Sequence, residues 1–187
     1  MTCAQDILHR VFGLHDFRGF QADVIETLAQ GRDALVLMPT GGGKSLCYQI
    51  PALMREGVTI VVSPLIALMA DQVAGLEELG ISAAYLNSAL SWPQQRDVQR
   101  QLAAGSIKLL YVAPERLVMP ATIELLKRTR SGFLRLTKRI ASRCGGTTFA
   151  QNTARSRFFA NYGPKCRAWR SRPRLTLIRA AKSSKSF

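Results

Sequence analysis

The chain has no acidic residue after Glu124. Residues 1–124 contain all 12 Asp and Glu together with nine Lys and Arg, so this segment has a net charge of −3. Residues 125–187 contain the other 17 Lys and Arg, so that segment has a net charge of +17. The overall charge of +14 is therefore not a property of the whole chain. Any chemistry that needs a carboxylate is excluded from the second segment.

Long apolar runs and a secretory leader are also missing. No uninterrupted apolar run approaches the ~18 residues of a membrane span, so we expect no membrane contact. The first six residues show no basic region followed by an apolar stretch, so we expect no signal peptide. Four cysteines without paired or metal-ligand spacing fit free thiols in a reducing, cytoplasmic environment. The oligomeric state is not indicated by the sequence.

The most informative stretch that is present is glycine-rich. It reads Met-Pro-Thr-Gly-Gly-Gly-Lys-Ser over residues 38–45, after an apolar strand-like run and before a run that can form a helix up to Pro51. Strand, glycine loop and helix is the context of a phosphate-binding loop. Glycines let successive N–H groups turn toward an anion, and the helix N-terminus adds its positive dipole end.

This pattern predicts that Thr40, Gly41, Gly42, Gly43, Lys44 and Ser45 bind a nucleotide. Lys44 would reach the β- and γ-phosphates, and the Ser45 hydroxyl would be a Mg²⁺ ligand. The strict motif fails at its first position, where Met38 replaces glycine. The alternative interpretation is a glycine-rich turn beside a surface lysine.

Hydrophobic periodicity predicts an α/β fold with a parallel sheet and flanking helices. Strands are expected at 33–38, 57–63, 82–86 and 107–112, and helices at 4–12, 21–29, 46–50, 66–79, 91–104 and 121–127. Ligands bind such sheets at the carboxyl ends of strands, which here are the loops 39–45, 63–65 and 113–116. From residue 130 the apolar period is lost. We therefore expect residues 1–129 to form one domain, with four strands, and 130–187 to be an irregular, poorly ordered basic tail.

Five stretches, in order, resemble the first half of a RecQ-type DNA helicase, a branch of helicase superfamily 2. They are Phe17-Arg18-x-x-Gln21, the run from Met38 to Leu53, Val61 to Met69, Tyr85 to Ser88, and Leu110 to Leu117. The resemblance covers about residues 7–129. Met38 in place of the first glycine of the strict motif is normal in this family. It implies a truncated RecA-like domain, ATP and Mg²⁺ as cofactors, single-stranded or forked DNA as partner, and 3′→5′ unwinding in DNA recombination and repair.

The resemblance also implies roles for single residues. Gln21 would read the adenine edge and Arg18 would support the nucleotide, although Gly19 and Phe20 replace the usual Pro-Gly and Leu14 stands where an aromatic ring usually stacks. Eight residues would lie along the path of single-stranded DNA and contact it mainly through backbone groups. They are Ser63, Pro64, Leu65, Asn87, Ser88, Pro114, Glu115 and Arg116.

The Asp-Glu-Ala-His box of the family is missing, because no acid follows Glu124. Phosphoryl transfer needs such an acid to hold Mg²⁺ and orient the attacking water, so we assign no catalytic residue. A one-base shift of codons for Ala-Ile-Asp-Glu-Ala-His-Cys-Ile-Ser yields Arg-Leu-Thr-Lys-Arg-Ile-Ala-Ser, the sequence of residues 135–142. We therefore hypothesise that residues from about 130 onward are an out-of-frame translation. Our first interpretation of the chain is therefore an inactive fragment of a helicase.

Two alternatives remain. One is a nucleotide-binding core with a genuine basic arm for nucleic acid. The 17 positive charges favour this interpretation, whereas the absence of repeats and of regularly spaced aromatic residues argues against it. The other is a small P-loop kinase, for which acceptor-site acids and a lid are not evident.

Overall fold

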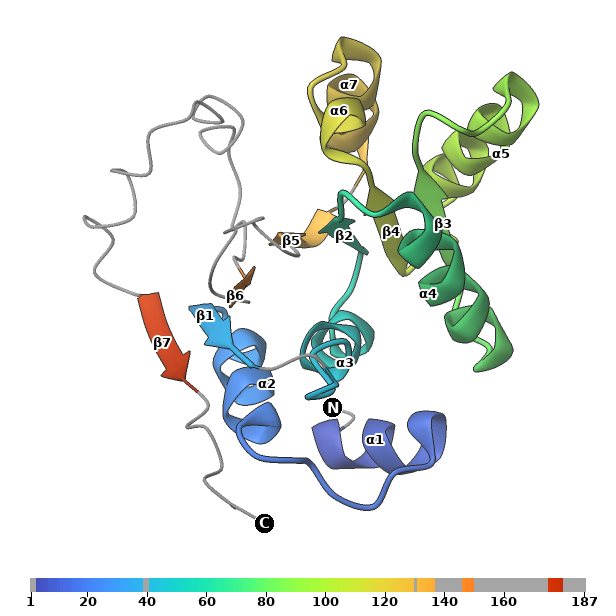
Figure 1. Ribbon diagram of the computed structural model, residues 1–187. Coiled ribbons are helices and arrows are strands. Elements are labelled where there is room, and N and C mark those ends of the chain that lie inside the picture. Colours follow the sequence, from blue (N-terminus) through green and yellow to red (C-terminus); the bar gives the residue numbers. More distant parts are fainter. Residues whose placement is uncertain (1–2, 39–40, 130, 137–145, 150–174, 180–187) are drawn as a thin grey trace.

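The computed structural model of the chain describes residues 3–38, 41–129, 131–136, 146–149 and 175–179 (Figure 1). Seven helices are described: α1 (Ala4–Phe12), α2 (Gln21–Ala29), α3 (Leu46–Met54), α4 (Ile66–Glu78), α5 (Trp92–Ala103), α6 (Pro114–Leu117) and α7 (Pro120–Arg128). The described strands are β1 (Asp33–Leu37), β2 (Val58–Val62), β3 (Ala83–Leu86), β4 (Leu109–Val112), β5 (Ser131–Leu136), β6 (Gly146–Phe149) and β7 (Leu175–Arg179).

The strands form one sheet in the order β3-β4-β2-β5-β6-β1-β7. Strands β3, β4, β2 and β5 are parallel to one another, and β7 is parallel to β1. Only β6, among the described strands, runs antiparallel to its neighbours β5 and β1. The carboxyl ends of the other six therefore meet at one edge of the sheet, where the predicted binding loops follow β1, β2, β3 and β4.

The direction of β6 follows from the length of the link before it. A crossover between parallel strands needs about a dozen or more residues. Only residues 137–145 separate β5 from β6. An antiparallel return is therefore the arrangement that this short link allows.

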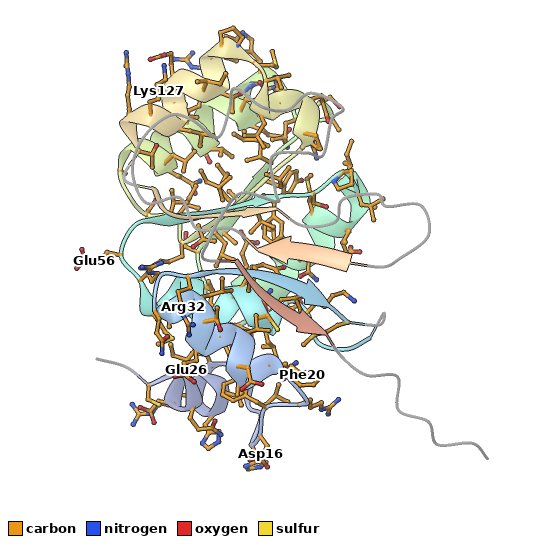
Figure 2. The ribbon with its side chains drawn as sticks, turned by 90° about the vertical axis from the view of Figure 1, so that its left-hand side faces the viewer. Asp16, Phe20, Glu26, Arg32, Glu56 and Lys127 are labelled. Atoms are coloured by element: carbon orange, nitrogen blue, oxygen red, sulfur yellow. The ribbon has the colours of Figure 1, made fainter. Side chains whose placement is uncertain are left out.

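Helices cover both faces of the sheet. One apolar cluster joins α2, α3 and α4 to β1 and to one face of β2, β3 and β4, with Val24, Cys47, Met69 and Val61 among its members. A second joins α5, α6 and α7 to the other face. Helix α1 packs outside the first layer, on α2 and α3. Figure 2 shows this layering edge-on, with Asp16 and Phe20 at one end of the molecule and Lys127 at the other.

Two helix termini follow from local sequence. Helix α1 ends at Gly13, which has a left-handed backbone (φ 64°) that glycine adopts without a Cβ clash. Ser91 is the N-cap of helix α5, and its side chain and that of Gln94 form a reciprocal capping box.

The sheet departs from expectation beyond residue 130. We expected it to end after four strands, but β5 pairs with β2 and the described residues of β6 and β7 extend it around β1. That expectation of an early end was wrong. The other residues of the predicted basic tail lie outside the described part of the chain, so its predicted disorder stays a prediction.

Two helical expectations were also wrong. Helix α3 does not stop at Pro51 but continues to Met54, because Ile50, Pro51 and Ala52 are all buried and hold this turn against its neighbours. Helix α6 was not expected; Pro114 occupies its first turn, a position where the missing N–H has no helical partner to lose. No helix of the described residues is both long enough and apolar enough to cross a membrane.

Candidate nucleotide site and nucleic-acid interface

The glycine loop is a turn between β1 and α3. Gly41 (φ 82°) and Gly43 (φ 68°) both have left-handed backbones, which cost a residue with a side chain about 1–2 kcal/mol. Residues 41–45 are not helical, and α3 starts directly after them. The backbone therefore needs glycine here, and two of the three predicted glycines have a conformational reason to be present. Thr40, also predicted, lies outside the described residues.

The amine of Lys44 points back to the end of β1. Its Nζ donates a hydrogen bond to the carbonyl oxygen of Met38 over 3.1 Å. Met38 is the residue directly after β1, so the amine lies at the mouth of the first strand. This is the position from which it can reach the phosphates of a nucleotide seated on the loop.

Ser45 connects the loop to α3. Its backbone carbonyl accepts hydrogen bonds from the N–H groups of Tyr48 (3.1 Å) and Gln49 (3.0 Å), which closes the first turn of the helix. The earlier N–H groups of the helix point toward the loop. A helix N-terminus of this kind attracts an anion through these donors and the helix dipole.

Gln21 connects α2 to the glycine loop. Its Nε2 donates to the carbonyl oxygens of Gly43 (3.1 Å) and Gly42 (3.4 Å), and its Oε1 accepts from the backbone N–H of Arg18 (2.8 Å). The side chain is only 1% exposed. The structure thus brings Arg18, Gln21, Gly42 and Gly43 together, while their predicted contacts with a nucleotide stay a prediction. The amide faces the loop, so reading an adenine edge requires it to exchange at least part of these bonds.

Three loops follow the adjacent strands β2, β4 and β3. Ser63 is buried and its backbone N–H donates to the Val112 carbonyl over 3.1 Å, while its Oγ accepts from the N–H of Leu65 (3.3 Å). Pro64 is half-buried and the Leu65 side chain is exposed. The start of the first loop is therefore fixed to the end of β4, and its next residues face outward.

The second and third loops are joined by a side chain. Arg116 Nε donates to the Asn87 carbonyl oxygen over 3.1 Å, and the Asn87 side-chain oxygen accepts from the N–H of Ala89 (3.0 Å). Ser88, Pro114 and Glu115 are exposed beside them. The eight residues predicted for the DNA path therefore lie at one edge of three neighbouring strands. Their proposed contacts with DNA stay a prediction.

One buried polar cluster was missed by sequence reasoning. The hydroxyl groups of Tyr48 on α3 and Tyr111 on β4 lie 2.9 Å apart, and the Tyr48 hydroxyl donates to Gln72 Oε1 on α4 over 3.0 Å. The two rings meet edge to face. The two tyrosines are buried in the first apolar cluster and Gln72 is half-buried at its edge, and no spacing rule in the sequence pairs them.

The residues present fit the two cofactors unequally. The left-handed glycines, the helix N-terminus and the Lys44 amine suit the phosphates of ATP. For Mg²⁺ they offer the Ser45 hydroxyl, but the described residues contain no group of three or more His, Cys, Asp or Glu side chains that could hold a metal. Any Mg²⁺ here would depend largely on the phosphate oxygens.

Comparison with known proteins decides the family. The sequence model of DEAD/DEAH box helicases matches residues 18–141, about two thirds of the chain. The chain belongs to the DEAD/DEAH box helicase family. This matched segment contains the glycine loop, all three strand-end loops and the whole of β5.

Relatives of this helicase segment confirm the resemblance to RecQ-type enzymes. It is 50% identical to the ATP-dependent DNA helicase RecQ of Pasteurella multocida over 131 residues, which are 70% of this chain and 21% of that protein. It is also 50% identical to the protein of the same name from Bacillus subtilis over 125 residues, 66% of this chain and 21% of that protein. The chain thus spans about a fifth of the length of these relatives.

Solved structures support the fold. A hypothetical ATP-dependent RNA helicase from Sulfolobus tokodaii superposes on this helicase segment with a TM-score of 0.60 at 20% identity, covering 74% of this chain and 41% of that one. The DUF1998 helicase MrfA superposes with a TM-score of 0.57 at 17% identity, covering 72% and 23%. The predicted α/β class with a RecA-like, mostly parallel sheet is therefore confirmed, and the chain covers less than half of either solved chain.

Proposed function

We propose that this chain is the N-terminal part of the ATP-binding domain of a RecQ-type DNA helicase, and that it binds a nucleotide on the loop 40–45. The observation that carries this proposal is the position of Lys44, whose amine lies at the end of β1 beside two left-handed glycines. The relatives that share half of its sequence are named as ATP-dependent DNA helicases. ATP is therefore the ligand, and single-stranded or forked DNA is the polymer.

The nucleotide proposal is tested by equilibrium binding. A fluorescent ATP analogue is titrated into the full chain, and the bound probe is displaced with ATP, ADP, adenosine or inorganic phosphate. Because the loop holds phosphates, ATP and ADP should displace the probe far better than adenosine. If adenosine displaced the probe as well as ATP and ADP do, or if the probe did not bind, the proposal would be refuted.

We further propose that the chain alone does not hydrolyse ATP or unwind DNA. Transfer of the phosphoryl group needs a carboxylate to hold Mg²⁺ and to orient water. The described residues place no metal-binding group of acids near the loop, and the sequence contains no acid after Glu124. Release of phosphate from ATP should therefore stay at background when single-stranded DNA is added. Turnover that DNA stimulates and Lys44→Ala abolishes would contradict this.

The missing acids have a proposed genetic cause. Residues 135–142 agree with a one-base shift of codons for the family's Asp-Glu-Ala-His region. The nucleotide sequence tests this directly, because one of its other two reading frames near codon 137 should encode Asp-Glu-Ala-His. A gene without that sequence in either frame would refute the frameshift without affecting the nucleotide proposal.

The second candidate, a nucleotide-binding core with a basic arm, is favoured by one observation only, the charge of +17 in residues 125–187. Such an arm would bind any nucleic acid through phosphates, with a steep dependence on salt. Binding through the strand-end loops should instead prefer single strands over duplexes at the same salt concentration. Equal affinity for both forms would favour the arm.

A further inference from the structure

An aromatic and cationic surface lies on α5, outside the motifs described above. Trp92 is 69% exposed, the highest value among the large apolar side chains of the described residues. Arg96 and Arg100 follow it at intervals of four residues, which places all three side chains along one side of the helix. Together with Pro93 they line a shallow pocket of about 460 Å³. We call Trp92, Arg96 and Arg100 the α5 stripe.

The opposite side of α5 explains why the stripe faces outward. Leu102 is buried, and Val98 packs with it on the second apolar cluster of the sheet. Helix α5 therefore already has its apolar contact with the sheet, and Trp92 is not part of it. The exposed Trp92 ring is therefore available to a ligand without any change in the packing of α5.

Hydrogen bonds and a proline fix the start of α5, so the backbone at Trp92 has a defined position. The N–H of Ser91 donates to Gln94 Oε1 over 2.9 Å, and Gln95 Nε2 donates to the Leu90 carbonyl over 2.8 Å. Pro93 restricts the backbone in the first turn. Ordering the ring on binding would therefore cost little backbone freedom.

The charges around the ring favour an anionic ligand. The pocket lining contains two guanidinium groups and no carboxylate. Asp97 lies 3.2 Å from Arg100, but both side chains are more than half exposed, so this ion pair is weak and an incoming phosphate can compete for the arginine. A protein-docking surface would present several contiguous apolar side chains, whereas here a single ring lies beside two cations.

The stripe continues from the proposed DNA path. Asn87 and Ser88 precede α5 by only a few residues, and Arg116 is bonded to the Asn87 carbonyl. The glycine loop starts α3, which packs on the other face of the sheet. Figure 1 shows α5 far from α1 and α2, at the opposite end of the molecule. The stripe is thus separate from the nucleotide site and next to the loop after β3.

We propose that the α5 stripe is an additional binding site for single-stranded nucleic acid, with a base stacked on Trp92 and phosphates on Arg96 and Arg100. Base–aromatic stacking next to basic side chains is the usual way in which proteins hold unpaired strands. The proposal goes beyond the proposed function, because it requires neither a nucleotide on the loop 40–45 nor contacts from the strand-end loops.

The test uses the fluorescence of Trp92 in the full chain. The chain has two tryptophans, so Trp169→Phe leaves Trp92 as the only one. An oligothymidylate should quench Trp92 emission along the same curve as its own binding, measured by the anisotropy of a label on the strand. If the strand binds and Trp92 emission does not change, the strand binds elsewhere on the chain, for example on the basic tail. That outcome would overturn the proposal.

Variants separate stacking from other roles of the ring. Trp92→Phe should keep most of the affinity, whereas Trp92→Ala should weaken binding by roughly 5- to 150-fold, the range expected for one stacked base. Equal affinities for these two variants would argue against stacking. A Trp92-dependent self-association without nucleic acid, seen by sedimentation, would assign the stripe to a second copy of the chain and overturn the proposal.

The arginines are tested by salt dependence. Each phosphate contact on a single strand contributes about 0.7 to the slope of log affinity against log salt, so Arg96→Gln with Arg100→Gln should reduce the slope by about 1.4. Arg10→Gln with Arg32→Gln, at two exposed arginines outside α5, is the matched control for the loss of two charges and should change the slope much less. Equal slopes in the double variant and the control would refute the phosphate contacts.

Discussion

The side-chain nitrogen of Gln21 donates a hydrogen bond to the carbonyl oxygen of Gly43 over 3.1 Å. The same nitrogen lies where a Cβ on residue 43 would have to be. Gly43 also has a left-handed backbone, with φ of 68°. The positive φ therefore favours glycine at this position, and a Cβ here would also displace the Gln21 amide from its hydrogen bonds.

The first prediction is that Gly43→Ala abolishes nucleotide binding and destabilises the fold. The new methyl group would displace Gln21 and strain the loop. Gly105→Ala is the matched control, because Gly105 has a similar φ of 70° but no atom within 4 Å of its added Cβ. It should cost only the backbone strain, about 1–2 kcal/mol, and leave nucleotide binding intact. Urea unfolding and probe titration measure both effects.

The second prediction concerns Lys44. Lys44→Ala should weaken nucleotide binding by roughly ten- to a hundredfold, because a hydrogen bond to a charged group contributes about 1.5–3 kcal/mol. Lys108→Ala is the control, since Lys108 Nζ also donates to a backbone carbonyl, that of Arg55, over 2.9 Å. The control should bind the probe as the wild type does. Equal losses in the two variants would mean that the Lys44 effect is structural.

The third prediction is that the hydroxyl groups of Tyr48 and Tyr111 stabilise the fold as a pair. Removing one leaves the other without this partner inside the protein, so Tyr48→Phe and Tyr111→Phe should each cost about 1–2 kcal/mol. The double variant should cost less than their sum, as expected for residues in contact. Tyr85→Phe, at a half-buried tyrosine outside the pair, should change stability by less than about 0.5 kcal/mol. Strict additivity in denaturant unfolding would contradict the pairing.

The fourth prediction is a pH effect at α7. Lys127 donates a hydrogen bond to Glu124 over 2.7 Å, and this bond together with the lysine charge lowers the pKa of Glu124 below its ordinary value of 4.5. A lowered pKa in the folded state means that the pair stabilises the protein above that value and stops doing so as pH falls through the folded pKa. Lys127→Met should therefore raise the pKa of Glu124, measured by NMR titration of its carboxyl carbon.

Stability gives the corresponding control. Both side chains are more than half exposed, so the difference in unfolding free energy between Lys127→Met and the wild type should be small at pH 7 and should vanish in acid, once Glu124 is protonated in both states. A difference that grows in acid would contradict the assigned cause.

Much of the first 129 residues could be predicted because local signals and the fold agree there. The β-branched run that forms β2 is buried along its whole length, and the heptad-like spacing of Met69, Val73 and Leu76 gives the buried side of α4. Gln21 and Lys44 could be assigned because their motif fixes their position relative to the glycine loop. At these places the spacing of residues in the sequence is enough to predict which of them lie close together in the structure.

Other features could not be predicted because they depend on contacts between distant segments. Burial keeps Pro51 within α3 although its lack of an N–H favours an end to the helix. The Tyr48–Tyr111 contact joins residues 63 positions apart. The addition of β5, β6 and β7 to the sheet depends on which strand edges are unpaired. The spacing of apolar residues in the sequence does not predict this. Trp92 could be seen in the sequence, but its exposure could not.

The reversed direction of β6 limits which residues can reach the phosphates. Its carboxyl end leaves the sheet at the edge away from Lys44, so among the described strands after residue 130 only β5 and β7 end on the nucleotide side. The sequence continues from β5 with Thr-Lys-Arg and from β7 with Ala-Ala-Lys. Neither continuation supplies a negative charge. We therefore expect that any Mg²⁺ bound with the nucleotide is held by the Ser45 hydroxyl and the phosphate oxygens, without a carboxylate from the ends of β5 or β7.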